Sequence, residues 1–363
     1  MIVKVSDKKQ LKNFLYYITD LYKDCENYVF PVFASLKKEV GQIVLVDKTY
    51  TAILCIKDDK IVGRLLYTIG DSKQKNGKIG YFSYFDCIND ETVAKELFDF
   101  MENDLKTKVT YIEGTFSPFD SDTRRGVLVK GYDKPHTILT SYNYDYYEKL
   151  LISCGYAKAY DTFTFSIPFT DKNFKLTKLV GESVTKHFDI RVDSLDFKNL
   201  DRDIKDVHNI LSQATTEANY QEAPSLQIIQ DFAKNVKHII NPNFVKIARE
   251  NGTNKPIGFC LTLPDFNQIL AKTKGKINPF LFLTGKNKID SVRGVLQYVI
   301  PEYQKTGLLI LIYNKTYEEF LKYNIKTFEG GTILENNKNA WSYIIKLGGE
   351  LTKIYRIFGK DII

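Results

Sequence analysis

One order of predicted secondary-structure elements occurs twice in this sequence, and the repetition constrains the fold more than any other feature. In each half, short apolar segments bounded by turn residues predict strands, and segments with helical periodicity alternate with them. The halves also carry similar segments, Ile112-Glu113-Gly114-Thr115 in the first and Glu329-Gly330-Gly331-Thr332 in the second. A matched order of elements with similar segments indicates an internal duplication.

We therefore expect two similar mixed α/β domains, each a twisted, mostly antiparallel sheet with helices on both faces. The length of 363 residues suits two domains of ordinary size. The expected boundaries are 1–169 for the first domain and 187–363 for the second, with the polar, lysine-rich stretch 170–186 as the linker. One continuous sheet without pseudo-duplication would contradict this expectation.

The individual elements follow from the same patterns. In the first half, strands are expected at 52–56, 61–69, 79–88, 109–116 and 157–167, and helices at 91–106 and 144–154. In the second half, strands are expected at 188–192, 244–249, 257–263, 292–300, 327–333 and 351–358, and helices at 203–213, 225–239, 307–323 and 338–347.

Composition narrows the classes of function. The formal net charge is +7, from 51 basic and 44 acidic residues, but the lysines are spread along the chain, so a nucleic-acid partner is not expected. Five cysteines without C-x-x-C spacing and four histidines without ligand-like spacing predict reduced thiols and no metal site. Because the N-terminus has no apolar signal core and no apolar run is long enough to cross a bilayer, we expect a cytoplasmic protein without a membrane partner.

The most informative passage is Val299-Ile300-Pro301-Glu302-Tyr303-Gln304-Lys305-Thr306-Gly307-Leu308-Leu309. An apolar strand ends at Pro301, which has no N–H for a ladder, and a helix begins near Gly307. Such a turn directs backbone N–H groups and the helix dipole at one point, which suits phosphate or pyrophosphate. We expect Gly307 to be needed where a ligand or backbone comes close, and the fold to tolerate aspartate there. The alternative is that Gly307 only starts a packed helix.

The segment from Gln304 to Leu309 resembles the Q/R-x-x-G-x-G/A pyrophosphate loop of the GNAT superfamily of N-acyltransferases. Val299 to Tyr303 is similar to the strand exit that precedes this loop in the family. Downstream, the run from Leu334 to Gly349 is similar to the family's N-x-x-A … K-L-G-F helix. The whole chain resembles uncharacterised bacterial proteins built from two GNAT-like halves, closely over 245–363 and more loosely over 1–168.

The resemblance implies an acyl-CoA N-acyltransferase fold, with acetyl-CoA or another acyl-CoA as co-substrate and a small-molecule or peptide amine as acceptor. It implies that the CoA pyrophosphate is held by the backbone of Gln304, Lys305, Thr306, Gly307, Leu308 and Leu309. Val299 and Ile300 would pair along the pantetheine arm where two strands diverge, and Asn337 would hydrogen-bond that arm.

The sequence departs from the family pattern at two positions. Leu309 stands where the family prefers Gly or Ala, and Ile344 stands where a tyrosine often serves as the general acid. Tyr343 is adjacent and is a candidate for that role, although one helical position is about 100° of rotation. Asp265 and Glu335 are candidates to accept the amine proton through water, the alternative being that they are solvated surface carboxylates.

The first half lacks a matching loop. Its equivalent turn, 87–92, contains no glycine and adds acidic groups, so CoA is expected only in the second half. The first half is then a degenerate copy that serves as scaffold or acceptor wall, and its long loop 117–143 is either functional or a solvated connection. Three functions stay open for the chain, as a monomer or homodimer: an acyl-CoA-dependent N-acyltransferase, a non-catalytic CoA- or nucleotide-binding module, and a transferase that uses aminoacyl-tRNA.

Overall fold

Helices and strands alternate along both halves of the chain. The computed structural model describes residues 1–72, 75–116, 125–215, 224–237, 240–276 and 278–362. The first half contains β1 (Ile2–Lys4), α1 (Lys8–Leu21), α2 (Phe33–Gly41), β2 (Thr51–Lys57), β3 (Lys60–Ser72), β4 (Gly77–Cys87), α3 (Glu91–Leu105), β5 (Tyr111–Gly114), β6 (Val127–Lys130), α4 (Tyr147–Ser153) and β7 (Ala157–Pro168). The second half contains α5 (Asp171–His187), β8 (Ile190–Ser194), α6 (Leu200–Ala214), α7 (Leu226–Val236), β9 (Val245–Glu250), β10 (Pro256–Pro264), α8 (Asn267–Leu270), α9 (Pro279–Gly285), β11 (Ser291–Val299), α10 (Leu308–Phe320), β12 (Thr327–Leu334), α11 (Lys338–Lys346) and β13 (Glu350–Asp361).

Strands of both halves join in one sheet, which in the described residues has the order β1-β2-β3-β4-β5-β13-β7-β12-β11-β10-β9-β8, with β6 beside β13. Neighbouring strands are antiparallel except β4 with β5 and β11 with β12, which are parallel. From one edge inward the strands are β1-β2-β3-β4-β5-β13, and from the other edge they are β8-β9-β10-β11-β12-β7, so the two halves have the same strand order. The sheet is therefore continuous, yet it contains the expected pseudo-duplication, and the predicted mixed α/β class is confirmed.

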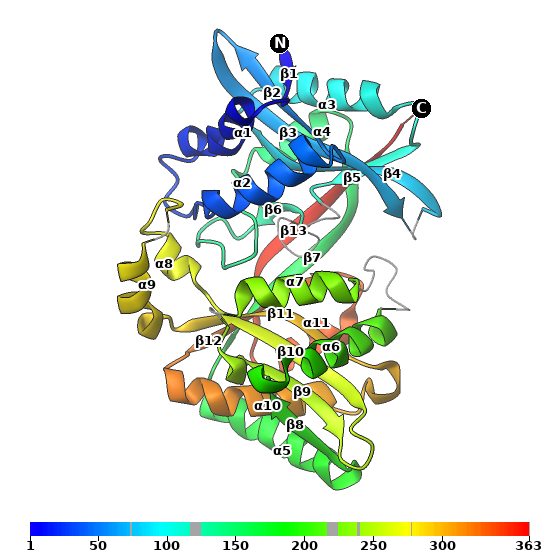
Figure 1. The fold of residues 1–363 in the computed structure, drawn as a ribbon, viewed down its shortest axis with the longest axis vertical. Coiled ribbons are helices and arrows are strands. Elements are labelled where there is room, and N and C mark those ends of the chain that lie inside the picture. Colours follow the sequence, from blue (N-terminus) through cyan, green and yellow to red (C-terminus); the bar gives the residue numbers. More distant parts are fainter. Residues whose placement is uncertain (73–74, 117–124, 216–223, 238–239, 277, 363) are drawn as a thin grey trace.

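The last strand of each half lies in the other half. β7 closes the first half in sequence but pairs with β12, and β13 closes the second half but pairs with β5. The two exchanged strands also pair with each other over Glu350–Gly359. As a result the C-terminal strand runs up into the first half (Figure 1).

The stretch 170–186, expected as a linker, forms helix α5 instead. Thr170 caps this helix by accepting a hydrogen bond from the N–H of Asn173. Gly181 of α5 lies against Leu311 of α10, since a Cβ on this glycine would be 3.1 Å from the leucine side chain. The segment is thus a packed element of the second half, and the boundaries 1–169 and 187–363 remain a prediction.

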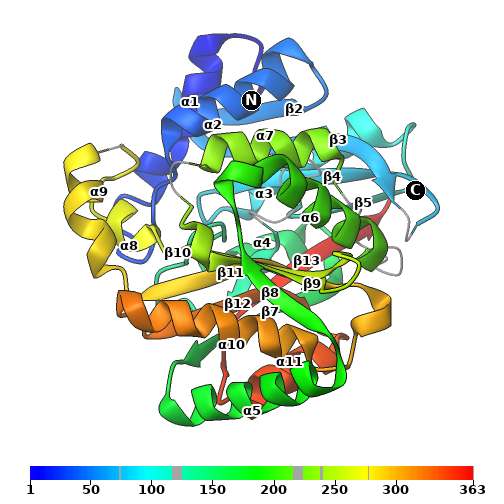
Figure 2. The same ribbon diagram turned by 60° about the horizontal axis from the view of Figure 1, so that its bottom comes forward.

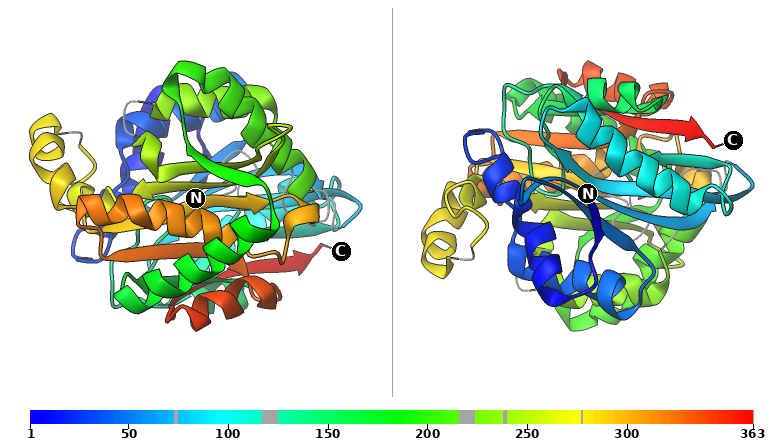
Figure 3. Two further views of the ribbon diagram at one scale, coloured as in Figure 1. Left: turned by 90° about the horizontal axis from the view of Figure 1, so that it is seen from below. Right: turned by 90° about the horizontal axis from the view of Figure 1, so that it is seen from above.

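Helices cover both faces of the sheet in the second half. Ile210 and Leu211 of α6 and Leu308, Leu311 and Ile312 of α10 belong to one buried cluster with the central strands. Figures 2 and 3 show α6 and α7 on one face and α5, α10 and α11 on the opposite face. The amphipathic pattern of these segments, apolar on one side and charged on the other, accounts for this placement.

Both parallel pairs separate after a few residues. β4 pairs with β5 only over Gly80–Phe82, and β11 pairs with β12 only over Ser291–Gly294. Beyond these points β11 continues beside β10 as far as Val299, while β12 continues beside β7, with which it already pairs from Thr327 onward. Close to each point of separation, the register shifts between one parallel strand and its antiparallel neighbour, in β3–β4 and in β10–β11. Each shift marks a β-bulge, which bends the strand away from its parallel partner. Each half therefore has a vertex where two parallel strands diverge.

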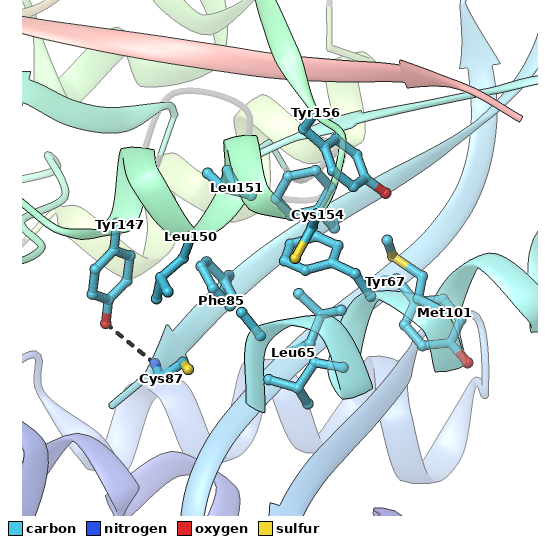
Figure 4. Packing of buried hydrophobic residues seen from close by; sticks show 14 of the residues in the cluster. Leu65, Tyr67, Phe85, Cys87, Met101, Tyr147, Leu150, Leu151, Cys154 and Tyr156 are labelled. Atoms are coloured by element: carbon cyan, nitrogen blue, oxygen red, sulfur yellow. Dashed lines mark hydrogen bonds between the residues drawn. The ribbon is translucent and has the colours of Figure 1, made fainter. Parts of the chain in front are cut away.

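The first-half vertex is filled by aromatic side chains. Phe82 is fully buried and its ring packs edge-on against Phe98 and Tyr156, with centroids 5.1 and 5.5 Å away. Figure 4 shows the surrounding cluster, in which side chains from β3, β4, α3 and α4 meet. Aromatic packing of this kind contributes to stability beyond the area that it buries.

Candidate functional site

The chain turns sharply between β11 and α10. β11 ends at Val299, and the N–H of Ile300 donates to the carbonyl of Ile257. A short 3-10 turn, Pro301–Tyr303, follows, and then Lys305 and Gly307 take left-handed conformations with φ of 65° and 91°. The helix starts at Leu308, so the predicted strand–turn–helix is present.

The first turn of α10 has no side-chain cap. The N–H of Leu308 donates to the hydroxyl of Thr306 at 3.3 Å. The amides of Lys305, Gly307 and Leu309 donate to no other group in the described part of the chain. Unpaired amides at a helix start, together with the positive end of the helix dipole, favour an anion.

The structure shows why position 307 needs a glycine, which the sequence alone did not reveal. A Cβ at this position would lie 3.1 Å from the side chains of both Val180 and Val184 on α5. The glycine therefore allows α5 to pack against the start of α10, and its φ of 91° is costly for most L-residues. The expectation that the fold tolerates aspartate at Gly307 is wrong for this reason.

The other residues predicted to contact CoA differ in burial and in their existing hydrogen bonds. Val299 and Ile300 are buried, so only their backbone would be able to pair with a pantetheine arm. The side chain of Gln304 donates to the carbonyl of Val299 at 3.3 Å. Leu309 is half-buried among the core residues of this half. Asn337 caps α11 by accepting from the N–H of Ala340, so its side-chain oxygen already has a partner.

A polar cluster occupies the vertex of β11 and β12. Arg293 and Glu329 are register partners on the last paired positions before Gly294 and Gly330. The Arg293 guanidinium donates to Glu329 at 2.8 Å and is 3% exposed, which makes this a buried ion pair. Thr137, from the first half, also donates its hydroxyl to Glu329. The first half therefore contributes a residue to the vertex of the second.

Asp265 lies beside this cluster. Its Oδ1 accepts hydrogen bonds from the N–H of Ile138 at 2.8 Å and the N–H of Asn267 at 3.2 Å. Burial raises the pKa of Asp265 to about 6, and the nearby Glu329 carboxylate adds to the rise. A buried carboxyl with a pKa near neutrality is suited to accepting and releasing a proton.

Two further groups around Asp265 are also perturbed by burial. His136 contacts Asn267 through its ring, and burial lowers the pKa of His136 to about 4, so the imidazole is neutral at pH 7. Burial also lowers the pKa of Lys353, whose ammonium donates to the carbonyls of Gly131 and Lys134. The loop of the first half that carries these contacts reaches the vertex through Thr137, which donates to Glu329.

Small and polar side chains line the vertex. Gly331 faces the guanidinium, because a Cβ there would lie 2.9 Å from Arg293 Nη1 and 3.0 Å from Thr164 Oγ1. The Thr164 hydroxyl is buried and has no hydrogen-bond partner among the residues described. At Gly294, a Cβ would collide with the Gln297 amide, which also accepts a hydrogen bond from Tyr313 of α10. The vertex thus offers a guanidinium, a hydroxyl and an amide beside the buried Phe328 ring, which lies next to Gly294 and Gly330.

The three predicted catalytic residues do not come together. Glu335 accepts from the ammonium of Lys158 at 2.7 Å and from the N–H of Asp161, on the exchanged strand β7. Tyr343 is 48% exposed on α11, with the Lys346 ammonium over its ring. Of the three, Asp265 is the one whose pKa is raised in part by the Glu329 carboxylate of the vertex.

Sequence reasoning missed most of this cluster. Arg293 and Gln297 fall within the strand expected at 292–300, and His136 is one of the four histidines without ligand-like spacing, so none of them was expected at a site. The available signal was the repeated Glu-Gly pair, since Glu113 and Glu329 hold the same register position in the two parallel pairs. Asp120, Asp122 and Arg124 of the long loop lie outside the described residues.

Two splayed parallel pairs, each flanked by an antiparallel sheet and helices on both faces, define the acyl-CoA N-acyltransferase (GNAT) fold, here present twice in one chain. A tandem GNAT protein from the clavulanic acid biosynthesis pathway is similar with a TM-score of 0.58 at 9% identity, over 100% of this chain and 98% of that one. A GCN5-related N-acetyltransferase from Sphaerobacter thermophilus is similar with a TM-score of 0.55 at 10% identity, over 99% and 96%. These likenesses confirm the predicted GNAT fold over the full chain.

Two curated proteins are similar in sequence over nearly their whole length. Protein YghO from Escherichia coli strain K12 is 26% identical, over 98% of this chain and 94% of that protein. Bacterial ceramide synthase from Caulobacter vibrioides is 23% identical, over 99% of this chain and 97% of that protein. No family profile matches the sequence.

The described ranges contain no group of three or more His, Cys, Asp or Glu side chains arranged to hold a metal ion. Among the helices that the structure describes, none combines the length and the apolar character needed to span a bilayer.

Proposed function

We propose that the protein is an N-acyltransferase that takes an acyl group from acyl-CoA and transfers it to an amine, with CoA held by the second half. The observation that carries the proposal is the start of α10, where unpaired amides meet at the end of a diverging parallel pair. The similarity to a tandem GNAT protein and to a GCN5-related N-acetyltransferase supports it.

The residues around α10 fit a pyrophosphate. The free amides of Lys305, Gly307 and Leu309 supply donors, and the exposed Lys305 side chain adds a positive charge beside them. Between this point and the vertex, the backbone of β11 would pair with the pantetheine arm. The predicted contact with Asn337 would require that side chain to give up its capping hydrogen bond.

The chemistry requires one bond to form and one to break. The amine nitrogen attacks the thioester carbonyl carbon, the C–S bond breaks, and the electron pair leaves on the CoA thiolate. The amine proton goes to a base, and Asp265 is our candidate because its raised pKa allows it to hold a proton near neutral pH. A backbone N–H of β11 beyond the vertex would stabilise the oxyanion.

The acceptor is proposed at the level of chemical class. One relative is named a bacterial ceramide synthase, and ceramides are amides of long-chain amino alcohols. This relative supports an amine as the acceptor. The unpartnered Thr164 hydroxyl beside Arg293 supplies hydrogen-bonding capacity for such a polar group at the vertex.

Charge reversal at Lys305 tests the CoA site. Lys305→Glu leaves the backbone amides in place but puts a carboxylate next to the pyrophosphate. We expect calorimetry with acetyl-CoA on the full chain to show binding weakened by about 10- to 100-fold. Lys12→Glu, at an exposed position of α1, is the matched control and should bind as the wild type does.

Three outcomes discriminate the alternatives. If Lys305→Glu and wild type bind acetyl-CoA equally, or neither binds any acyl-CoA, the proposed site is wrong. If acyl-CoA binds at this site but no thiol is released with any amine tried, the protein is a binding module. Turnover that requires aminoacyl-tRNA in place of acyl-CoA would identify the third function.

A further inference from the structure

Helices α8 and α9 form a projection between β10 and β11. They stand out from the body of the molecule in every view (Figures 1, 2 and 3). The inner side of the projection is held by Leu281 and Phe282, which pack against the buried cluster of Phe266, Ile269 and Ile289. The projection is therefore a packed element with a fixed inner face.

The outer face of α9 carries two large apolar side chains in solvent. Phe280 is 70% exposed and Leu283 is 68% exposed, which makes them two of the most exposed large apolar residues of the described chain. They are three positions apart on the helix, so both point to the same side. Exposing two large apolar groups on one short helix is unfavourable in water and indicates a contact surface.

Lysines flank these two side chains in the sequence. Between Asp265 and Asp290 the sequence contains five lysines and no acidic residue. All five (Lys272, Lys274, Lys276, Lys286 and Lys288) are exposed. The acidic residue at the end of this stretch, Asp290, pairs with Lys326 outside it. The projection is thus a locally cationic surface with an apolar tip.

We propose that this projection is a membrane-interface anchor for anionic lipid. Phe280 and Leu283 enter the boundary between headgroups and acyl chains, while the lysines contact lipid phosphates. Lysine is suited to this position because its alkyl stem lies along apolar surface while its ammonium stays at the phosphate level. Binding of this kind lies on the bilayer and needs no spanning helix, and it departs from the expectation, drawn from the sequence, that the protein has no membrane partner.

The shape of the feature favours a bilayer over a protein. A protein partner of this chemistry requires a complementary pocket or groove for the two side chains. A projecting tip with two exposed apolar side chains and five exposed lysines in the same segment matches a fluid, anionic, planar surface without such a pocket. The loop between α8 and α9 also contacts the first half, because the N–H of Phe33 donates to the carbonyl of Gly275 at 3.4 Å. This contact helps to fix the position of the projection.

Sedimentation with lipid vesicles tests the proposal on the full chain. Wild type should bind vesicles of phosphatidylcholine with about 30% phosphatidylglycerol, and this binding should fall as NaCl rises from about 0.1 M to about 0.5 M. Pure phosphatidylcholine vesicles should bind at least about ten-fold less. Equal binding to both compositions, or no binding to either, would overturn the proposal.

Substitutions separate the apolar and the cationic contributions. Phe280→Ser with Leu283→Ser should lower the partition coefficient on anionic vesicles by at least about ten-fold, since both side chains leave the bilayer. Lys286→Gln with Lys288→Gln should lower it to a smaller extent and reduce its salt dependence. The control is Leu176→Ser with Leu179→Ser, on the exposed side of α5, which should bind as wild type does.

A fluorescence probe keeps the test independent of protein loss. Phe280→Trp should show a blue-shifted emission with anionic vesicles and quenching by brominated acyl chains, compared with the wild type, which contains only Trp341. Emission that is unchanged by vesicles would show that the tip stays in water, and the proposal would then be wrong.

Discussion

Strands β4 and β5 in the first half and β11 and β12 in the second form equivalent parallel pairs that diverge at equivalent positions. In the first pair, Phe82 stands opposite Gly114, and a Cβ on this glycine would be 2.7 Å from the Phe82 ring. In the second pair, Gly294 stands opposite Gly330, and the Gln297 amide shares the space beside Gly294 with the Phe328 ring. One backbone arrangement thus surrounds aromatic packing in one half and a mixture of polar and aromatic side chains in the other.

The helices that follow the two pairs, α3 and α10, differ in how their first turns are capped. Asp90 caps α3, and its carboxylate accepts from the N–H groups of Thr92 and Val93. Gly307 precedes α10 and has no side chain with which to cap it. The first half therefore neutralises its helix end with its own carboxylate, while the first amides of α10 have no such carboxylate. A few side chains thus distinguish the two copies at equivalent helix ends.

The largest effect is expected from emptying the first vertex. Phe82→Ala removes a ring that is fully buried against Phe98 and Tyr156, which should lower the free energy of unfolding by about 3–5 kcal/mol. Urea unfolding measures this loss. The affinity for acetyl-CoA should stay within about two-fold of wild type, because the proposed site is in the other half.

Two results would contradict this comparison. A loss of stability below about 1 kcal/mol would mean that the aromatic side chains do not fill the first vertex. A folded Phe82→Ala variant that binds a second equivalent of acetyl-CoA would mean that Phe82 alone closes the first half to the ligand.

The second prediction concerns Asp265, beside the second-half vertex. Its ionised form should lower the free energy of unfolding, whereas the buried Phe82 ring raises it. The pKa of Asp265 is about 6 in the folded protein, above its value of about 3.9 in an unfolded chain. Between these pH values the native state binds more protons than the unfolded state, so this carboxyl lowers stability as pH rises from about 4 to about 6. At pH 7 its ionised form costs about 3 kcal/mol, whereas burial of Phe82 stabilises the fold.

Asp265→Asn should remove that cost while its oxygen still accepts from Ile138 and Asn267. The free energy of unfolding of the variant, minus that of wild type, should grow by about 3 kcal/mol from pH 4 to pH 7. The difference between the two proteins is the quantity to measure, because the depressed pKa of His136 acts in the same window. A pH-independent difference would show that folding does not raise the pKa of Asp265. Acyl transfer, if Asp265 is the base, should be lost in the same variant.

The fold was largely predictable from local pattern. Alternating apolar segments and turn residues located most strands within a few positions, because the side chains of a half-buried strand alternate and turns require specific residues. Helix α1, between β1 and β2, was missed. The exchange of β7 and β13 was not predictable either, since the same pattern satisfies pairing with a strand of either half.

The site was predictable only where backbone geometry has a local signature. Gly307 and the turn before it follow from neighbouring residues in the chain. The vertex cluster joins Thr137, Asp265, Arg293 and Glu329, which are far apart in sequence and meet only because the sheet is continuous. The packing of α5 against Gly307 was not predictable either, because α5 is also distant from Gly307 in sequence.

The smallest effect is expected from the helix cap of the first half. Asp90→Ala removes the carboxylate that accepts from Thr92 and Val93, and should lower the free energy of unfolding by about 1 kcal/mol. Asp7→Ala is the matched control, because Asp7 caps α1 through the N–H groups of Lys9 and Gln10, away from either vertex. Both variants should lose a similar amount of stability by urea unfolding.

Binding then shows what the cap contributes to the difference between the halves. Asp90→Ala frees the first amides of α3 and removes a negative charge, so α3 comes to resemble α10 at this end. We still expect one equivalent of acetyl-CoA by calorimetry, because Phe82 and its neighbours leave no room between β4 and β5 for a pantetheine arm. A second equivalent in Asp90→Ala, absent from Asp7→Ala, would mean that charge at the helix end, and not packing at the vertex, closes the first half.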